Sequence, residues 1–261
     1  MAGIKRLWNS FKIAFSMFSK IPMPQADWTE ENMKYMLCFF PFIGTAIGVV
    51  MLAASWVYQH LGFERAFAAV IFVLIPVIVT GGIHVDGLLD TSDALSSWRD
   101  REKRLEILKD SHAGAFAVIT ACVYFLASFG GMSQICDNKK AMQILAAGYM
   151  VSRCLSGIGV VSLPKANASG TVAEFSRKAQ DRTVRNVLIL YLVVLAGIMI
   201  WIQPVWGVCA FVSALAVFGF YKHKAMKYFG GTTGDLSGYF LCLCELWMIL
   251  VLAVITVIYK L

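Results

Sequence analysis

Long stretches without a charged residue constrain this chain more than any other feature of its sequence. Crossing a bilayer takes about 20 mostly apolar residues, because an unpaired backbone group in lipid is very costly. Six stretches are long enough: 35–63, 66–85, 113–136, 141–163, 186–221 and 236–259, with Arg153 and Glu245 as the only charges inside them. The 186–221 stretch can hold two helices that meet at Gln203 and Pro204. We therefore expect an all-α, polytopic membrane bundle with about seven transmembrane helices.

The composition supports this expectation. Apolar residues make up 59% of the 261 residues and charged residues 15%, against about 45–50% and about 25% in a soluble domain. These values exclude a disordered chain, a basic nucleic-acid-binding domain and most soluble enzymes. The seven cysteines form no C-x-x-C pair, which predicts buried thiols in place of disulfides or a zinc site. Without an internal repeat or a flexible linker, residues 1–261 are expected to form a single membrane domain.

The distribution of Lys and Arg predicts the orientation, because cytoplasmic loops carry an excess of both. With the N-terminus inside, the inner segments hold 18 of the 23 Lys and Arg residues and the outer segments hold four. We expect an N-in/C-out protein of the bacterial cytoplasmic (inner) membrane, with the lipid bilayer as its surroundings and no nucleic-acid partner.

The first 34 residues differ from the rest of the chain. Trp8, Phe11, Phe15 and Phe18 recur at helical spacing among basic residues. This pattern predicts an amphipathic helix that lies at the cytoplasmic interface. The alternative is a helix that packs as an N-terminal cap on the bundle.

The inner segment after the second stretch carries three aspartates in one pattern. Asp86, Asp90 and Asp93 stand at i, i+4 and i+7, so on a helix they share one face. Three like charges destabilise an empty helix, whereas Mg²⁺ takes oxygen ligands and is often shared with substrate phosphates. The alternative is that Asp90 or Asp93 caps the helix around Ala94 and the other acids are solvated.

Two further polar clusters lie on the same predicted side. One precedes the 113–136 stretch, where a helix N-terminus favours an anionic ligand. The other has the sequence GGTTGD, and its glycines let backbone amides approach a phosphate. The clusters contain Lys109, Asp110, Ser111, Gly231, Thr233, Gly234 and Asp235. In the alternative interpretation, both are ordinary helix N-caps.

Arg153 and Glu245 are charged residues inside apolar stretches, where a charge is usually functional or paired. Arg153 either holds a phosphate or carboxylate of a ligand, or forms a structural pair with Glu245. His84 stands two residues before Asp86 and points away from the aspartate face on an ideal helix. It joins the site only if the preceding pair of glycines distorts the backbone.

Five motifs resemble one known family. FPFIGTAIG (40–48), GGIHVDGLLDTSDAL (81–95), ILKDSHAGAFAV (107–118) and GGTTGD (230–235) are similar to segments of cobalamin synthase. AFSMFSKIPMP (14–24) resembles the N-terminal segment of the same family. Its members are the adenosylcobinamide-GDP ribazoletransferases of late vitamin B12 biosynthesis, and the motifs follow in order from about residue 10 to 250.

The resemblance implies a Mg²⁺-dependent transfer at the cytoplasmic face. A ribose hydroxyl of α-ribazole, or of its 5′-phosphate, attacks the cobinamide-bearing phosphorus of adenosylcobinamide-GDP, and GMP leaves. By position, the implied metal ligands are Asp86, Asp90, Asp93, Asp110 and Asp235, and the implied catalytic residues are Asp86, Asp90, Asp93 and His84. The implied substrate-binding residues are Lys109, Asp110, Ser111, Arg153, Gly231, Thr233 and Gly234.

Two other functions stay open at this stage. CDP-alcohol phosphatidyltransferases, which are lipid synthases, also gather aspartates at a cytoplasmic helix end. An ion-coupled transporter would need acids near the bilayer midplane and an inverted repeat. The sequence leaves the formation of a homo-oligomer open. Two basic segments, 99–109 and 165–185, are expected to flank the site and attract anionic substrates, or only to enforce topology.

Overall fold

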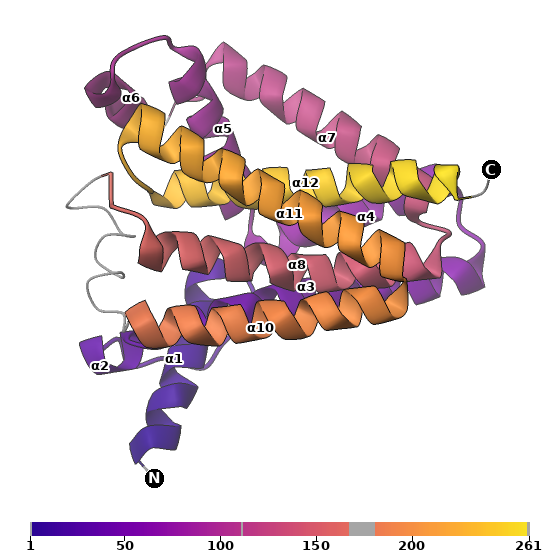
Figure 1. Cartoon of the computed structure of the whole chain (residues 1–261), viewed down its shortest axis with the longest axis horizontal. Helices are drawn as coiled ribbons and strands as arrows, with labels where there is room; N and C mark the ends of the chain where they lie inside the picture. Colours follow the sequence, from indigo (N-terminus) through magenta and orange to yellow (C-terminus); the bar gives the residue numbers. More distant parts are fainter. Residues whose placement is uncertain (1, 111, 167–180, 260–261) are drawn as a thin grey trace.

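The computed structural model describes residues 2–110, 112–166 and 181–259, and the regular elements within them are helical. These are α1 (Ala2–Phe18), α2 (Glu30–Met33), α3 (Met36–Leu61), α4 (Arg65–Thr80), α5 (Ile83–Ser96), α6 (Arg101–Ile107), α7 (Ala115–Ile135), α8 (Lys139–Ser162), α10 (Asp181–Ile202), α11 (Pro204–Lys224), the π-helix η1 (Ala225–Phe229) and α12 (Gly234–Ile258). The long helices run side by side, and α1, α5 and α6 lie toward one end of the bundle (Figure 1).

Six helical segments are long and apolar enough to cross a membrane: α3, α7, α8, α10, α11 with η1, and α12. The pair α4 and α5 adds a seventh if it is counted as one span, although the two helix axes differ by 94°. The expected all-α bundle of about seven spans is therefore confirmed. The expected end of the second span at residue 85 is wrong, because α4 stops at Thr80.

Two glycines cause this early stop. Gly81 and Gly82 have φ angles of 67° and 81°, a left-handed conformation that glycine adopts without steric cost. The chain then restarts as α5 in a new direction. The expected break in the 186–221 stretch is confirmed at Gln203, whose side chain accepts a hydrogen bond from the Trp206 N–H at 2.7 Å. Pro204 occupies the first turn of α11, where no N–H is needed.

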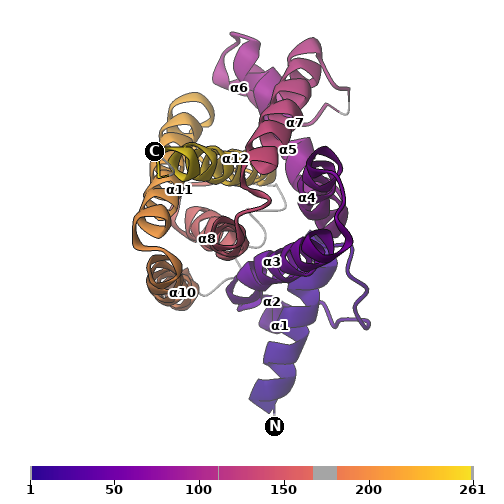
Figure 2. The ribbon, with the colours of Figure 1, turned by 90° about the vertical axis from the view of Figure 1, so that its right-hand side faces the viewer.

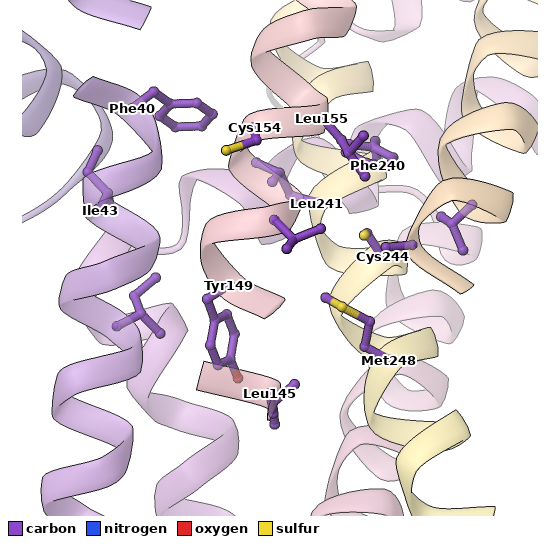
Figure 3. Close-up of a cluster of buried hydrophobic side chains, with 14 of the residues drawn as sticks. Phe40, Ile43, Leu145, Tyr149, Cys154, Leu155, Phe240, Leu241, Cys244 and Met248 are labelled. Carbon is purple, nitrogen blue, oxygen red and sulfur yellow. The ribbon is translucent and has the colours of Figure 1, made fainter. Parts of the chain in front are cut away.

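Helix α8 is the centre of the bundle and packs against α3, α10, α11 and α12, as Figure 2 shows. Side chains of α3, α8 and α12, including Phe40, Cys154 and Leu241, form the buried core between them (Figure 3). A Cβ atom added to Gly44 would lie 2.2 Å from the Tyr149 carbonyl oxygen. The α3 backbone thus packs directly on α8, as small residues allow in membrane proteins.

Helix α1 combines the two arrangements considered for the N-terminal segment. Its C-terminal half packs on the bundle. Ile13 and Phe15 are buried, and the centres of the Phe18 and Phe40 rings are 4.6 Å apart. Its N-terminal half projects from the bundle (Figure 1) and exposes Ile4 and Trp8. The first half thus has the apolar surface of an interfacial helix, and the second is a packed cap.

Candidate active site

Helix α5 carries the three aspartates of the 81–95 motif across one end of the bundle. The glycine break turns it away from α4, so it lies outside the long spans (Figure 1). The helix is regular from Ile83 to Ser96, and Asp86, Asp90 and Asp93 therefore share one face, as their spacing predicts. Asp86 is exposed, whereas Asp90 and Asp93 are half-buried.

A close crossing of two helices brings a fourth aspartate to this face. A Cβ atom on Gly87 would lie 2.6 Å from the Asp235 carbonyl oxygen, and one on Gly238 would lie 3.0 Å from the His84 carbonyl oxygen. The backbones of α5 and α12 are thus in contact at this crossing, which only glycine permits. Asp235, in the first turn of α12, joins the three α5 aspartates, and we call these four residues the acid cluster.

Burial and mutual repulsion disfavour the ionised form of Asp90 in the acid cluster. Burial, followed by the nearby charges of Asp86, Asp235 and Asp93, raises the pKa of Asp90 to about 6. Within the described part of the chain, no Lys or Arg forms an ion pair with any of the four carboxylates. None of the described Lys and Arg side chains is therefore paired with the charge that gathers here.

Asp93 has a structural partner that its position in the sequence does not reveal. Its Oδ2 accepts a hydrogen bond from the Gly114 N–H at 2.6 Å, and its Oδ1 accepts one from the Ala117 N–H at 2.9 Å. The carboxylate therefore caps the N-terminus of α7. The capping alternative named the wrong helix. Asp93 occupies the start of the 113–136 span in this structure, and the anionic ligand expected there stays a prediction.

The segment before α7 contributes exposed side chains that are not part of the acid cluster. Asp110 is exposed and its Oδ1 accepts hydrogen bonds from the His112 backbone N–H at 3.0 Å and from His112 Nδ1 at 2.7 Å. The hydrogen bonds from His112 lower the pKa of Asp110. Lys109 is exposed. Ser111 lies outside the described residues, as do Arg177 and Lys178 of the second basic segment.

The GGTTGD loop is held by the segment that follows α8. The Thr232 N–H donates to the Pro164 carbonyl at 2.8 Å, and the Ala166 N–H donates to the Thr232 carbonyl at 3.1 Å. A Cβ atom on Gly231 would lie 2.4 Å from that Pro164 oxygen. Thr233 is the N-cap of α12, with its Oγ1 accepting from the Leu236 N–H at 3.1 Å. Gly231 and Thr233 thus have structural partners, as the capping alternative expects for this loop.

Arg153 is paired inside the bundle and is 1% exposed. Its Nη1 donates to Glu245 Oε1, to the Tyr149 carbonyl at 3.1 Å and to Ser152 Oγ at 2.9 Å. Ser152 also donates to Glu245 Oε1 at 3.0 Å. The structural pair is therefore the correct alternative in this structure, and the guanidinium is not open to a ligand.

A cavity of about 220 Å³ lies beside the acid cluster. His84, Asp86, Gly234 and Asp235 line it together, so His84 does reach the site although it stands off the aspartate face. His84 is buried, and burial followed by the Arg153 charge lowers its pKa to about 3. A neutral imidazole with so low a pKa is a weak base at physiological pH.

Sequence reasoning did not single out most of the side chains that line this cavity, including one on α8 and one on α3. Ser156 on α8 and Phe40 on α3 both line it. Ser156 stands four residues after Ser152 in a span that is otherwise mostly apolar, and Phe40 opens the FPFIGTAIG motif. These were the signals available, but neither shows by itself which helices meet around the residue.

The donor set fits a hard divalent cation, although the side chains are not gathered into a complete site. Among the described residues, no three Asp, Glu, His or Cys side chains are arranged to hold a metal ion. Mg²⁺ usually keeps several waters and binds through one or two carboxylates together with substrate phosphates. Asp86, Asp90 and Asp235, whose carboxylates do not cap α7, would offer ligands of this kind.

Comparisons with known proteins identify one family. The family model for cobalamin-5-phosphate synthase matches residues 10–253. A protein of Lachnoclostridium phytofermentans named adenosylcobinamide-GDP ribazoletransferase is 45% identical over 91% of this chain and 90% of its own length. Relatives of the same name from Clostridium perfringens and Desulfitobacterium hafniense are 32% and 31% identical and cover 97% and 96% of the chain, and 100% and 97% of their own lengths. No solved structure matches the chain.

Proposed function

The chain belongs to the cobalamin-5-phosphate synthase family, and we propose that it joins adenosylcobinamide-GDP to α-ribazole, or to its 5′-phosphate, with release of GMP. The observation that carries this proposal is the acid cluster, whose carboxylates form no ion pair with a Lys or Arg of the described residues, beside a cavity at one end of a membrane bundle. Transfer of a phosphoryl group needs positioning and charge neutralisation more than covalent help from the protein. The acid cluster supplies the anchor for both.

In this proposal, one or two of the carboxylates of Asp86, Asp90 and Asp235 would hold Mg²⁺ together with substrate phosphates, and Asp93 positions α5 against α7. When bound, the ion would neutralise charge on the diphosphate and on the attacking and leaving oxygens. Asp110, which is bonded to His112, has a weaker claim as a ligand than the acid cluster. A carboxylate of the acid cluster that does not hold the ion, or His84, would accept the proton of the ribose hydroxyl.

We further propose that the acid cluster faces the cytoplasm of a bacterial cell with an inner membrane. In support, the acid cluster lies at the same end of the bundle as the basic helix α6, and the C-terminus lies at the opposite end (Figure 1). A cysteine replacing Arg99 should be protected from an impermeant thiol reagent in intact cells, whereas one replacing Lys139 should react. The background needs its exposed native cysteines removed, and labelling at position 99 would reverse the proposed orientation.

Purified protein with adenosylcobinamide-GDP, α-ribazole and Mg²⁺ tests the reaction. GMP and a corrinoid nucleotide should appear, and EDTA should stop their formation until Mg²⁺ is restored. Asp86→Asn should lower turnover at least about 100-fold, a loss typical for a group that stabilises transition-state charge. Glu102→Gln, which removes an exposed charge on α6, is the control. If wild-type protein releases no GMP, the proposed reaction is wrong.

A further inference from the structure

The cavity beside the acid cluster has two buried polar atoms without a partner. His84 Nε2 and Ser156 Oγ are buried and make no hydrogen bond within the described structure. The side chains are 9% and 1% exposed, and both line the cavity. Leaving a buried polar group unpaired costs about 1–3 kcal/mol, so each such group needs an explanation. A ligand that offers a polar atom to this wall would remove the cost.

The remaining wall determines what kind of ligand fits. Phe18, Phe40, Val160 and Leu241 contribute apolar surface from four different helices. The Phe40 ring also lies edge-on to the His84 imidazole, with 6.2 Å between ring centres. Ser237, the other hydroxyl of the wall, already donates to the Thr233 carbonyl at 2.9 Å. The interior therefore suits an aromatic group with little polarity.

The volume of the cavity limits which ligands can fit. A cavity of about 150 Å³ holds one benzene ring, and sites for drug-sized ligands start at about 300 Å³. The 220 Å³ measured here lies between these limits and matches one bicyclic ring system. A corrin macrocycle is far too large. Guanine is close in size, but several of its polar groups would face the apolar side chains of the interior, where His84 Nε2 and Ser156 Oγ are the unpaired polar atoms among the described residues.

On the basis of the proposed function, we propose that this cavity binds the benzimidazole base of α-ribazole. The base is bicyclic and apolar except for one ring nitrogen that accepts a hydrogen bond, which the Ser156 hydroxyl donates. Because Asp86 is exposed and Asp235 half-buried, the carboxylates lie at the open side of the cavity and His84 and Ser156 at the closed side. A base seated inside leaves its ribose, with the attacking hydroxyl, toward the acid cluster.

Ser156→Ala tests the polar contact with little change in volume. The KM for α-ribazole should rise about 3- to 10-fold, as for the loss of one neutral hydrogen bond, while kcat and the KM for adenosylcobinamide-GDP stay within twofold. Ser128→Ala is the matched control, because the Ser128 hydroxyl on α7 is also buried and unpaired but does not line this cavity. An unchanged KM for α-ribazole, or an equal rise for both substrates, would overturn the assignment.

Val160→Phe tests the volume requirement by filling the cavity, and it should weaken the binding of α-ribazole at least about tenfold. If this variant fails to fold, binding to wild-type protein decides the point. Guanosine should then displace bound α-ribazole only at concentrations at least about tenfold higher than unlabelled α-ribazole requires, and equal displacement would refute an apolar base site. Equilibrium binding of α-ribazole to wild type and Ser156→Ala needs no turnover. If wild-type protein binds α-ribazole but releases no GMP, only the proposed reaction is refuted. If neither cavity variant changes turnover, only the assignment of this cavity is refuted.

Discussion

Removing Glu245 should destabilise the protein more than removing its partner Arg153. The two side chains are 5% and 1% exposed, so each charge depends on the other. Breaking a buried ion pair costs about 3–5 kcal/mol. In Glu245→Leu the guanidinium keeps its bonds to Tyr149 and Ser152, which favours the lower limit of that range. At about 2–4 °C per kcal/mol, the apparent melting temperature should fall by roughly 6–12 °C.

Arg153→Met should cost less, because a stranded carboxyl can bind a proton and become neutral whereas a guanidinium cannot. The double variant Arg153→Met/Glu245→Leu should recover most of the loss. Thermal unfolding of the detergent-purified protein measures all three variants. Glu106→Leu is the control, since the Lys103–Glu106 pair is exposed and such pairs contribute little. If Glu245→Leu and Glu106→Leu shift the melting temperature equally, the coupling of the buried charges is refuted.

Three further predictions concern helix α5. Asp93→Ala should cost about 1–2 kcal/mol through the lost cap of α7, and amide hydrogen exchange should be faster in the first turn of that helix; unchanged exchange would contradict the cap. Gly87→Ala should cost about 1–3 kcal/mol in thermal unfolding, because its Cβ would lie 2.6 Å from the Asp235 backbone. Gly130→Ala, with open space around it, should have little effect, and equal effects would contradict the close crossing. In metal-free protein, the raised pKa of Asp90 means that the folded state binds a proton more tightly than the unfolded state between pH 3.8 and about 6. The free energy of unfolding should therefore fall as pH rises through this window, and it should fall less in Asp90→Asn. If the melting temperature depends on pH in the same way in both proteins, the raised pKa is contradicted.

The residues around α5 show how far sequence reasoning reaches. The shared face of the three aspartates and the break at Gln203 were predicted correctly, because each depends on residues that are neighbours in the chain. Whether the glycine pair distorts the backbone was left open. The exact end of the second span was not predicted, since apolar residues continue past Thr80 and hydropathy does not register a change of direction. The motifs also indicated the family that the comparisons identified.

The sequence by itself determined the membrane architecture and the positions of the acidic residues, since the length and periodicity of apolar segments are local properties. Only the tertiary structure decided what the individual charges contact. Asp93 caps a helix that begins 22 residues later, and Arg153 pairs with a residue 92 positions away. The cavity is bounded by side chains of α1, α3, α5, α8 and α12. The role of a polar side chain depends on its hydrogen-bond or ion-pair partner, and in a helical bundle that partner comes from whichever helix packs beside it.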